Sequence, residues 1–447
     1  MSIPKEAEFS DVCIVGMGYV GCSLATVLAE SGVQIQGLDI DEQIVERINR
    51  GECPIREDGI TNLFETYAQE GRITATSSYD ALADCSRIIV TVGTPLAESD
   101  PDLSAVKATT KAIALNLNSD DLLVYRSTLP AGVTEETIVP LLETHSTLRP
   151  GIDYALAFCP ERMAEGSAYN DLTSLPVVVG GYTDSCIERV EEFWEGLGNE
   201  TVSVSSPTTA ELTKLADNWW IDLNIALANE IALLAEELGV DALEVIQAAN
   251  TLPKGDNNVN ILYPGAGVGG SCLVKDPWFI AKLGEKHGLE LQTPRTSRAI
   301  NEKMPDHVVD LVAQSVADTS GASVAVLGYA FKKGTDDTRN TPAKAIVEGL
   351  QKVDVEIEIS DPFVTSTTIE SEVGISPSRL PEALEGADAV VLVTGHEEYH
   401  SLTPEDLVNY VGKDEFIVVD GRFVFEPDDF ANLSASYIGV GRGDTDE

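Results

Sequence analysis

Cys272 ends a glycine-rich segment in a pattern that suits a nucleophile. Residues 265–276 read Gly-Ala-Gly-Val-Gly-Gly-Ser-Cys-Leu-Val-Lys-Asp, so Lys275 and Asp276 follow the thiol at three and four residues. Glycines let backbone N–H groups approach a bound ligand, and a nearby ammonium group or helix N-terminus lowers the pKa of a thiol. We therefore interpret Cys272 as a candidate nucleophile; taken alone, the segment fits a small buried cysteine in a turn equally well.

A second glycine-rich segment, near the N-terminus, is typical of a turn that binds a dinucleotide. The apolar run 12–15 leads into Gly16-x-Gly18-x-x-Gly21, and residues with helical spacing follow. In such a strand, turn and helix the first glycine makes the turn and the second lets the backbone reach a pyrophosphate. The third lets the helix pack on the strand, with its N-terminus facing the anion.

Asp39 is the candidate partner of the cofactor's adenosine ribose. It ends the predicted strand 33–39, and a carboxylate there accepts hydrogen bonds from both ribose hydroxyls. Residues 40–42 read Ile-Asp-Glu and contain no arginine, so a 2′-phosphate would meet negative charge. The sequence therefore favours NAD over NADP. The alternative is a surface aspartate that closes a strand beside a structural glycine turn.

Length and composition predict a two- or three-domain protein of the cytoplasm. The chain has 447 residues, 43% of them hydrophobic, with no apolar targeting segment at its start and no apolar run of membrane-spanning length. Its seven cysteines show no C-x-x-C spacing. We interpret them as reduced thiols, neither a disulfide framework nor a zinc site, and we expect no metal.

The charge balance is strongly acidic along the whole chain. There are 74 Asp and Glu against 29 Lys and Arg, which gives a formal net charge of −45. Such a surface repels nucleic acids and anionic membranes, so neither is an expected partner. It resembles the surfaces of proteins from halophiles, because at 1 M salt the Debye length falls to about 3 Å and self-repulsion is screened. An ordinary acidic protein is the alternative.

A weak internal repeat predicts two similar α/β sheets. The run 12–16 recurs as 324–328, and the run 33–39 recurs as 355–361, each ending in Asp. The second copy reads Gly-Tyr-Ala-Phe-Lys over 328–332 in place of the glycine triplet, so we expect it to hold a different ligand. The predicted fold class is α/β, with two Rossmann-like parallel-sheet domains.

Between the sheets, the sequence predicts a helical region. Apolar residues recur at helical spacing from Leu212 to Leu238 and include Trp219 and Trp220. This long central helix would join the sheets and pack against another subunit in a homodimer or higher homo-oligomer, although an intrachain core is an alternative. The predicted domains are an NAD-binding domain (1–206), a central helical dimerisation domain (207–300) and a C-terminal Rossmann-like domain (301–447).

Further candidate residues lie on the central helix and after predicted strands. Lys214 and Asn218 are one turn apart, so they share a face that could bind an oxyanion; a snorkelling surface lysine is the alternative. Glu161 and Glu165 follow the apolar run 154–158, where open α/β sheets bind ligands; a solvated loop is the alternative.

Together these segments resemble the UDP-glucose/GDP-mannose dehydrogenase family over essentially the whole chain. The segments that carry the resemblance are Gly16-x-Gly18-x-x-Gly21, Thr94-Pro95, Ser127-Thr128-x-Pro130, Pro160-Glu161-Arg162, Lys214-x-x-x-Asn218, Gly269-Gly270-Ser271-Cys272 with Lys275-Asp276, Phe331-Lys332 with residues 335–339, and Asp420-Gly421-Arg422. The resemblance implies an NAD-dependent, four-electron oxidation of a UDP-sugar C6 alcohol to a uronic acid, without a metal, for surface polysaccharide or glycan synthesis.

The resemblance also implies a role for each candidate residue. A Cys272 thiolate would add to an aldehyde, because the resulting hemithioacetal can deliver a hydride and leave a thioester that water cleaves. Lys214 and Asn218 would hold the developing oxyanion. Asp276 with Thr128 would position a water as base for the alcohol, and Glu161 would activate the hydrolytic water.

Two residue sets follow from the same resemblance. The implied cofactor-binding residues are Gly16, Gly18, Tyr19, Val20, Gly21, Asp39, Thr94, Thr128, Glu165, Lys275 and Arg339. The implied substrate-binding residues are Glu161, Arg162, Lys214, Asn218, Gly269, Phe331, Lys332 and Arg422. Lys332, Arg339 and Arg422 would face the nucleotide half of the substrate, since arginine forks suit phosphate oxygens.

The identity of the sugar stays open at this point. Residues 160–166, Pro-Glu-Arg-Met-Ala-Glu-Gly, resemble the UDP-N-acetylmannosamine and UDP-N-acetylglucosamine branch, whereas residues 269–272 resemble the UDP-glucose branch. Residues 256–261 lack the arginine that crosses to the partner subunit in many members. A two-electron dehydrogenase of the 6-phosphogluconate kind and a non-catalytic NAD-binding regulator are the alternatives from other classes; neither needs Cys272.

Overall fold

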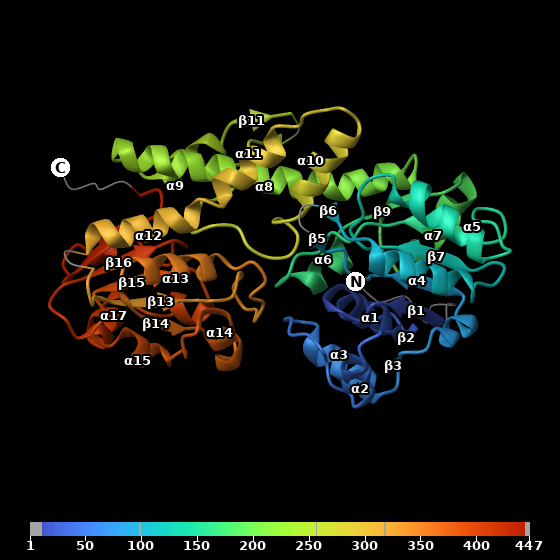
Figure 1. Cartoon of the computed structure of the whole chain (residues 1–447), viewed down its shortest axis with the longest axis horizontal. Coiled ribbons are helices and arrows are strands. Elements are labelled where there is room, and N and C mark those ends of the chain that lie inside the picture. The colour runs from blue at the N-terminus through green and yellow to red at the C-terminus, as the bar shows by residue number, and fades with distance from the viewer. Residues whose placement is uncertain (1–10, 98–99, 256, 317–318, 443–447) are drawn as a thin grey trace. The chain divides into compact units, whose positions relative to one another are not determined.

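The computed structural model describes residues 11–97, 100–255, 257–316 and 319–442. The chain forms two compact units, Met1–Asp217 and Asn218–Glu447, and the boundary falls within one long helix, α8 (Figure 1). Residue 256, in the stretch that lacks the family's arginine, lies outside the described residues.

The first unit alternates strands and helices. Its elements are β1 (Asp11–Val15), α1 (Tyr19–Glu30), β2 (Gln34–Leu38), α2 (Glu42–Asn49), α3 (Thr61–Gln69), β3 (Ile73–Thr76), β4 (Arg87–Val90), β5 (Leu96–Ala97), β6 (Asp100–Pro101), α4 (Ser104–Ala114), β7 (Leu122–Tyr125), α5 (Val139–His145), β8 (Ala155–Phe158), α6 (Ala168–Ser174), β9 (Val177–Gly181), α7 (Asp184–Gly196) and β10 (Thr201–Val204). Short 3₁₀ and π segments cover Tyr79–Asp84 and Thr134–Ile138.

The larger sheet has the strand order β10-β9-β8-β7-β4-β1-β2-β3. Its pairs are parallel except β8 with β9, so it is a mixed sheet at one side. The chain passes from β1 to β2 and β3 on one side and returns to β4 on the other. Open α/β sheets bind ligands at such a switch point, outside the carboxyl ends of the strands. The carboxyl ends of β1 and β4 therefore define the expected cofactor crevice.

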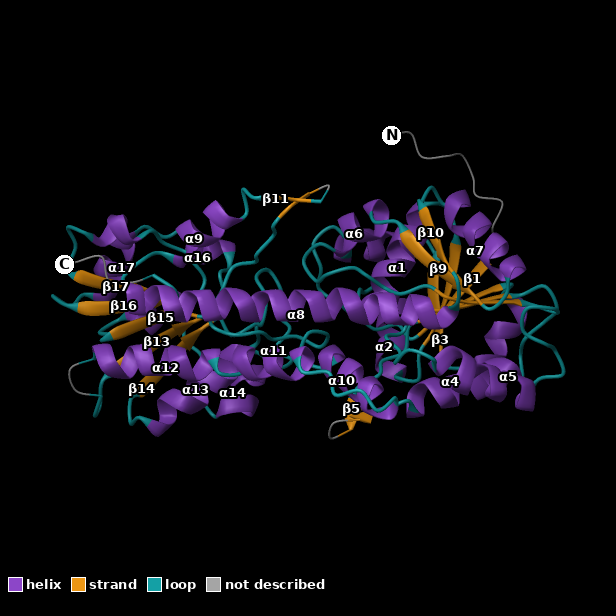
Figure 2. Ribbon diagram, turned by 90° about the horizontal axis from the view of Figure 1, so that it is seen from above, coloured by secondary structure: helices purple, strands orange, loops and turns teal. Residues whose placement is uncertain are grey.

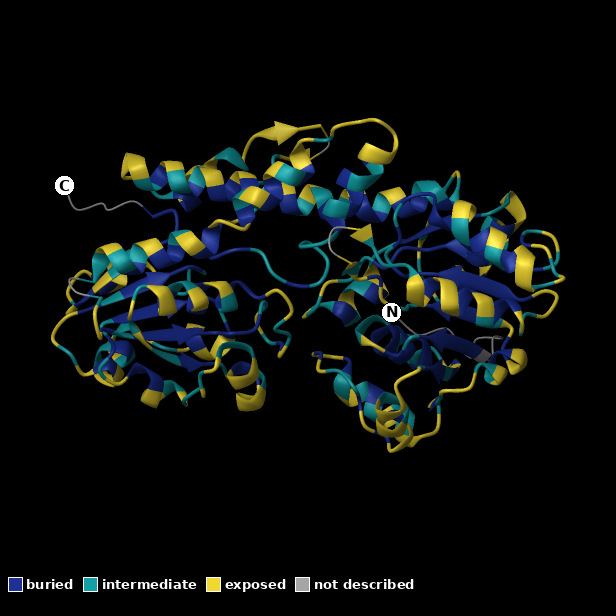
Figure 3. Ribbon diagram, viewed as in Figure 1, coloured by how far each residue is buried: buried dark blue, intermediate teal, exposed yellow. Residues whose placement is uncertain are grey.

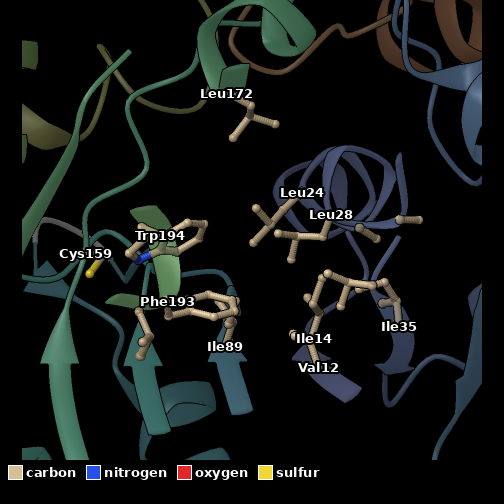
Figure 4. Packing of buried hydrophobic residues seen from close by; sticks show 14 of the residues in the cluster. Val12, Ile14, Leu24, Leu28, Ile35, Ile89, Cys159, Leu172, Phe193 and Trp194 are labelled. Carbon is tan, nitrogen blue, oxygen red and sulfur yellow. The ribbon is translucent and has the colours of Figure 1, made fainter. Parts of the chain in front are cut away.

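Apolar strands make this sheet a buried layer between helices. Alternate residues of β1 point to opposite faces, so Val12 and Ile14 join one hydrophobic cluster while Cys13 and Val15 join the other. Helix α7 packs Phe193 against the first face (Figure 4). Truncating a fully buried phenylalanine to alanine lowers the free energy of unfolding by about 3–5 kcal/mol. Figure 3 shows the buried strands and the exposed outer faces of the surrounding helices.

Helix α8 (Pro207–Leu238) is a single element of 32 residues (Figure 2). It begins at a proline, which suits the first turn of a helix, and at 1.5 Å per residue it is about 48 Å long. The central helix predicted over 212–238 is thus confirmed and extends five residues further toward the N-terminus.

The second unit continues with helices and then forms its own sheet. Its elements are α9 (Ala242–Ala249), β11 (Pro253–Lys254), β12 (Asn257–Asn258), α10 (Asp276–Lys286), α11 (Thr293–Asn301), α12 (Met304–Ser315), β13 (Ser323–Leu327), α13 (Pro342–Lys352), β14 (Glu356–Ser360), α14 (Ser366–Val373), α15 (Leu380–Leu384), β15 (Ala389–Leu392), α16 (Glu397–His400), α17 (Pro404–Val411), β16 (Phe416–Asp420) and β17 (Ala435–Gly439), with a 3₁₀ segment over Pro427–Phe430.

The sheet of the second unit is parallel throughout, in the order β14-β13-β15-β16-β17. The predicted α/β fold with two Rossmann-like sheets is therefore confirmed. The predicted helical region over 207–300 also contains a short antiparallel pair, β11 with β12. No helix among the described residues is long and apolar enough to cross a membrane.

The predicted internal repeat is visible in the backbone of both units. The N–H of Gly16 donates to the carbonyl of Leu38 at 2.8 Å, and the N–H of Gly328 donates to Ser360 at 2.9 Å. Both glycines have a positive φ, which favours glycine over other residues. After this shared turn the copies diverge: α1 begins at Tyr19, whereas no α-helix begins after β13 until α13. The second copy therefore lacks a helix N-terminus at this turn.

Near its start, within the first unit, α8 is hydrogen-bonded through a buried carboxylate to the segment 132–134. Glu211 is fully buried and accepts hydrogen bonds from the N–H of Gly132 at 2.6 Å and from the N–H and hydroxyl of Thr134. Burial raises its pKa to about 7, against the opposing effect of these hydrogen bonds. The bonds hold the loop that follows residues 127–130.

We expect the Glu211 carboxyl to make folding stability depend on pH. A folded-state pKa above the unfolded value contributes most at low pH, and that contribution is lost as pH rises through about 7. A shift of this size corresponds to roughly 3 kcal/mol. Urea unfolding of wild type and Glu211→Gln at about pH 5.5 and pH 8 tests this. The variant's free energy of unfolding should improve relative to wild type at the higher pH; an equal difference at both pH values would contradict the assignment.

Candidate functional site

The glycine turn after β1 has the geometry of a pyrophosphate-binding site. A Cβ on Gly21 would lie 2.0 Å from the carbonyl oxygen of Gly16, so only glycine allows this contact of helix and turn. A Cβ on Gly18 would meet no atom within 4 Å, which leaves open space beside the turn. Gly18 supplies no side-chain cap to α1, and the first turn carries no acid. The N-terminal N–H groups of α1, which begins with Tyr19 and Val20, can therefore face an anion.

Asp39 lies beside this turn at the end of β2. Its Oδ2 accepts a hydrogen bond from the N–H of Met17 at 2.7 Å, and its Oδ1 accepts one from the N–H of Asp41 at 3.0 Å. The carboxylate is partly exposed and keeps lone pairs for further donors. The geometry thus fits the predicted role of Asp39 as acceptor for the ribose hydroxyls.

Thr94 and Thr128 come together at the carboxyl ends of β4 and β7. The hydroxyl of Thr94 donates to the carbonyl oxygen of Thr128 at 2.6 Å. The two strands are adjacent and parallel, so their following loops meet at one edge. The contact places the hydroxyl of Thr94 and the backbone of Thr128 on the ligand-binding side of the sheet.

Glu161 follows β8 and is paired with Arg126, which follows β7. Two guanidinium N–H groups of Arg126 donate to Glu161 Oε2, at 2.5 and 3.2 Å, and both side chains are almost fully buried. The N–H groups of Arg162 and Met163 donate to Oε1 at 2.7 and 2.9 Å. Burial acts to raise the pKa of Glu161, but Arg126, the Met163 N–H and the charge of Lys214 outweigh it and hold the pKa below its ordinary value. Glu161 is therefore a fixed, ionised carboxylate.

Lys214 and Arg162 lie close to this carboxylate in the first unit. Lys214 is 7% exposed, and its charge acts on Glu161. Arg162 Nε donates to Asp217 Oδ2 at 3.0 Å, one helical turn from Lys214 on α8. A buried ammonium group beside an open ligand edge suits a negatively charged oxygen atom.

The loop that carries Glu165 is fastened to the glycine turn by Glu57, a residue that the sequence did not single out. Buried Glu57 accepts hydrogen bonds from the Tyr19 hydroxyl, from the N–H of Gly166 at 2.8 Å and from the N–H of Ala168 at 3.0 Å. Burial and the charges of Glu57 and Glu165 raise the pKa of Tyr19. The Tyr19 hydroxyl therefore stays protonated and links the two ligand loops.

In the second unit, Cys272 differs from the other cysteines in its exposure. All seven lie in the described part of the chain as free thiols; six are buried and Cys272 is partly exposed. Burial raises the pKa of Cys53 to about 11 and that of Cys159 to about 12, so these thiols are inert. The N–H groups of Lys275 and Asp276 donate to the carbonyl oxygen of Cys272 at 3.1 and 2.9 Å, and α10 begins directly afterwards. Cys272 is therefore the accessible thiol, close to a helix N-terminus.

Asp276 is enclosed by two of the predicted site residues. Its carboxylate is fully buried, accepting a hydrogen bond from the Asn218 amide at Oδ2 and lying 2.5 Å from Lys275 Nζ at Oδ1. Lys275 also lies over the ring of Phe279, 4.6 Å from its centroid. These contacts bring Asn218, Lys275 and Asp276 together. Each carboxylate oxygen of Asp276 takes part in one of these contacts, so Asp276 is placed to orient Asn218 and Lys275.

The Cys272 loop (265–276) packs against the loop that follows β13. A Cβ on Gly269 or Gly270 would lie 2.8 Å from atoms of Phe331, so the glycines allow this close contact. The N–H of Gly270 donates to the Arg339 carbonyl at 2.9 Å, and the side chain of Arg339 pairs with Asp337. Phe331 and Gly269, two of the implied substrate-binding residues, thus lie against each other, while Arg339 contributes its backbone to the loop.

Arg422 is also bound to the Cys272 loop. Its Nε donates to the Val393 carbonyl at 2.7 Å and its Nη2 to the Gly267 carbonyl at 3.3 Å. Burial lowers the pKa of Arg422, while the charge of Asp420 acts to raise it. A Cβ on Gly265 would lie 2.8 Å from Nη1, so the glycine leaves room for the guanidinium group of Arg422. Among the described residues, no group of three or more His, Cys, Asp or Glu side chains could hold a metal ion.

Two site residues that the sequence left without a role are Arg126 and Glu57. Arg126 directly follows the apolar run Leu122–Tyr125, so its burial, and its need for a buried acid, could have been inferred. Glu57 lies in a segment without clear periodicity, 109 residues from Gly166, and no local signal predicts that contact.

Family models match nearly the whole chain. The models of the UDP-glucose/GDP-mannose dehydrogenase family match as the NAD binding domain over residues 10–197, the central domain over 208–303 and the UDP binding domain over 325–427. The glycine turn, Asp39 and the Glu161 loop lie in the first of these ranges, and Cys272 in the second. The loop 328–335 lies in the third range.

Known proteins are similar to this chain over nearly its full length. The UDP-N-acetyl-D-mannosamine dehydrogenase of Pyrococcus horikoshii is 34% identical over 440 residues, 97% of this chain and 99% of that protein. The structure of the UDP-D-ManNAc dehydrogenase from this organism matches with a TM-score of 0.87, covering 97% and 100% of the two chains at 33% identity. A UDP-glucose dehydrogenase structure from Pyrobaculum islandicum also matches with a TM-score of 0.87, covering 99% and 100% at 28% identity. The chain therefore belongs to the UDP-glucose/GDP-mannose dehydrogenase family and is an NAD-dependent oxidoreductase.

Proposed function

We propose that this protein oxidises the C6 alcohol of a UDP-sugar to a carboxylate in two successive steps, through a thioester on Cys272. The observation that carries the proposal is that Cys272 alone among the seven cysteines is accessible, on a glycine-rich loop next to a helix N-terminus. Simple alcohol oxidation needs no thiol. A thiol is useful when an aldehyde must be oxidised further, because its adduct can lose hydride and the free aldehyde cannot do so readily.

The proposed reaction has two oxidation steps and one hydrolysis step. The alcohol loses a proton and a hydride to give the aldehyde, and the Cys272 thiolate adds to it to form an S–C bond. The oxyanion of this adduct is stabilised by Lys214 and Asn218. Loss of a second hydride leaves the thioester, and attack by water then breaks the S–C bond to release the acid and the thiolate. NAD supplies the hydride acceptor at each oxidation.

Glu161 has a narrower role in this scheme than the sequence predicted. The ion pair with Arg126 holds its pKa low, so it is a weak base. We assign it to orienting the hydrolytic water, with Arg126 keeping the carboxylate in place. Asp276 is assigned to orienting Asn218 and Lys275, in addition to the water-positioning role predicted with Thr128.

A UDP-N-acetylhexosamine, with N-acetylmannosamine first, is the substrate we favour. The relatives from Pyrococcus support it, as does the Pro160-Glu161-Arg162-x-x-Glu165 pattern. UDP-glucose is the second candidate, supported by the Pyrobaculum structure and by residues 269–272. For the nucleotide, Lys332 and Arg422 lie within the matched UDP binding domain. Comparing kcat/KM across UDP-N-acetylmannosamine, UDP-N-acetylglucosamine, UDP-glucose and GDP-mannose decides among them.

We also assign the exposed side of α8 to a homodimer contact, within the predicted central domain over 207–300. Trp220, Leu223, Leu227, Leu234 and Leu238 recur at helical spacing and are 36–65% exposed. An apolar stripe of this kind on one helix is typical of a subunit interface. A monomeric mass in solution would contradict this assignment.

Removing the Asp39 charge should reduce discrimination against NADP. Asp39→Asn keeps an acceptor for the Met17 N–H but removes the charge that repels a 2′-phosphate. We expect the ratio of kcat/KM for NAD to that for NADP to fall by about tenfold, which is a change of about 1.4 kcal/mol. Glu46→Gln, at an exposed position further along α2, controls for the loss of one acidic charge and should change the ratio little. Equal use of both cofactors by the wild-type protein would refute the role of Asp39.

Two NADH should form for each sugar consumed, and Cys272→Ala should lose net turnover. The variant cannot form a covalent adduct, but we expect it to bind NAD and the UDP-sugar, because neither contact needs the thiol. The matched control is Cys186→Ala, which removes a buried thiol on α7 and should change the thermal midpoint more than kcat. A stoichiometry near one, or a Cys272→Ala kcat above about a tenth of wild type, would rule out the thioester route.

A further inference from the structure

His396 lies at the switch point of the second sheet but is not part of the site described above. The chain moves from β13 to β14 on one side and to β15 on the other, and His396 follows β15. Its side chain is completely buried. A ligand at this crevice would contact the loops after β13 and β15. What His396 holds there is therefore relevant to the loop that carries Lys332.

The two ring nitrogens of His396 make two different bonds. The N–H of Gly334 lies 3.1 Å from Nδ1, and Nε2 lies 3.1 Å from Asp361 Oδ2. A backbone amide can only donate, so Nδ1 is the nitrogen without a proton. The proton is thereby assigned to Nε2, which donates to the carboxylate. His396 thus connects the backbone of Gly334 to Asp361.

Asp361 fixes the start of the same loop. Its Oδ2 also accepts the N–H groups of Tyr329 at 2.6 Å and Ala330 at 3.0 Å, while Oδ1 accepts those of Phe363 and Val364. Burial acts to raise the pKa of Asp361, but the hydrogen bond from His396 and these N–H groups hold it below the ordinary value. The carboxylate is therefore a permanent acceptor.

The loop between these two attachments, which we call the Lys332 loop (328–335), is held at both ends. Asp361 holds it at Tyr329 and Ala330, and His396 holds it at Gly334. Within the loop, the buried hydroxyl of Thr335 donates to the Lys332 carbonyl at 2.9 Å. Phe331, in the same loop, packs on the glycines of the Cys272 loop. The conformation of Lys332 thus depends on both attachments.

We propose that His396 is a positioning residue for nucleotide binding, which acts by fixing the far end of the Lys332 loop. This rests on the proposed function, in which Lys332 contacts the nucleotide diphosphate of the substrate. His396 does not touch the substrate itself, because it is buried and both nitrogens are used within the protein. Without the Gly334 bond the loop loses a buried backbone attachment near its far end, and binding must then supply the ordering that this bond now provides.

Two variants of His396 separate the two bonds. His396→Asn places an amide oxygen near the position of Nδ1, so it keeps an acceptor for Gly334 and loses the donor to Asp361. His396→Gln reaches Asp361 with its amide N–H and leaves Gly334 without an acceptor. The affinity of the full chain for UDP, measured by calorimetry in molar KCl, is the readout, together with KM and kcat for the UDP-sugar.

We expect His396→Gln to weaken UDP binding by about tenfold, the effect of one lost hydrogen bond to a buried group. KM for the UDP-sugar should rise similarly, while kcat at saturation and KM for NAD stay within about twofold, because no reacting group has changed. His396→Asn should retain most of the UDP affinity. His307→Gln, which removes the ring nitrogen paired with Glu236 elsewhere in the unit, is the control and should bind UDP like wild type.

Several results would overturn the inference. One is wild-type UDP affinity in His396→Gln, and another is equal loss in the Asn and Gln variants. If His396→Gln does not fold, Thr335→Val, which removes the bond to the Lys332 carbonyl, must weaken UDP binding through KM and not kcat. Failure of the wild-type chain to bind UDP would instead contradict the proposed function, so the two failures are distinguishable.

Discussion

In both units, a carboxylate after the second strand of the sheet holds the turn after the first strand. Asp39 accepts the N–H of Met17 at 2.7 Å, and Asp361 accepts the N–H of Tyr329 at 2.6 Å. A turn between buried parallel strands has few backbone partners of its own, so a fixed acceptor beside it stabilises one conformation. In each unit this bond fixes the turn from which the ligand-binding segment continues.

The same bond leads to different ligands because its surroundings differ. Beside Asp39, a glycine turn opens onto the N-terminus of α1, and the carboxylate keeps capacity for a ribose. Asp361 is instead saturated by backbone N–H groups and His396, and the turn continues as the Lys332 loop. A buried carboxylate without free lone pairs cannot receive ribose hydroxyls. The second copy has thus kept the architecture of a nucleotide site without its dinucleotide chemistry.

Buried charges around the candidate catalytic groups are paired in advance. Arg126 is matched to Glu161, and Lys275 and Asn218 to Asp276. Breaking a buried pair by removing one partner typically costs about 3–5 kcal/mol, so these side chains have little freedom to reorient. Preorganised charges of this kind stabilise an oxyanion without rearrangement during the reaction. The pairing of Glu161 with Arg126 also limits proton transfer, because a carboxylate that is held ionised is a weak base.

Much of this organisation was predictable from the sequence, because its signals are local. Apolar runs ending in glycine or aspartate predicted β1, β2 and their repeats β13 and β14, and helical spacing predicted α8. The antiparallel pairing of β8 with β9 was not predictable, since the apolar pattern of a buried strand does not show whether the strand runs parallel or antiparallel to its neighbour. Nor were the contacts of Glu57, Arg126 and His396, because each joins segments far apart in the chain. Their residue types indicate that a buried partner is needed without indicating which one.

The most direct test of the thioester route is to capture the intermediate on the protein. In Glu161→Gln the thiol is intact but the carboxylate beside the hydrolytic water is lost, so hydrolysis should become slower than formation of the adduct. Intact-protein mass spectrometry after mixing with NAD and the UDP-sugar should then show one added UDP-uronyl group, which hydroxylamine releases and which peptide mapping places on Cys272. The same experiment with Cys272→Ala should show no addition. A Glu161→Gln protein that folds, consumes substrate slowly and never carries the adduct would contradict covalent catalysis at Cys272.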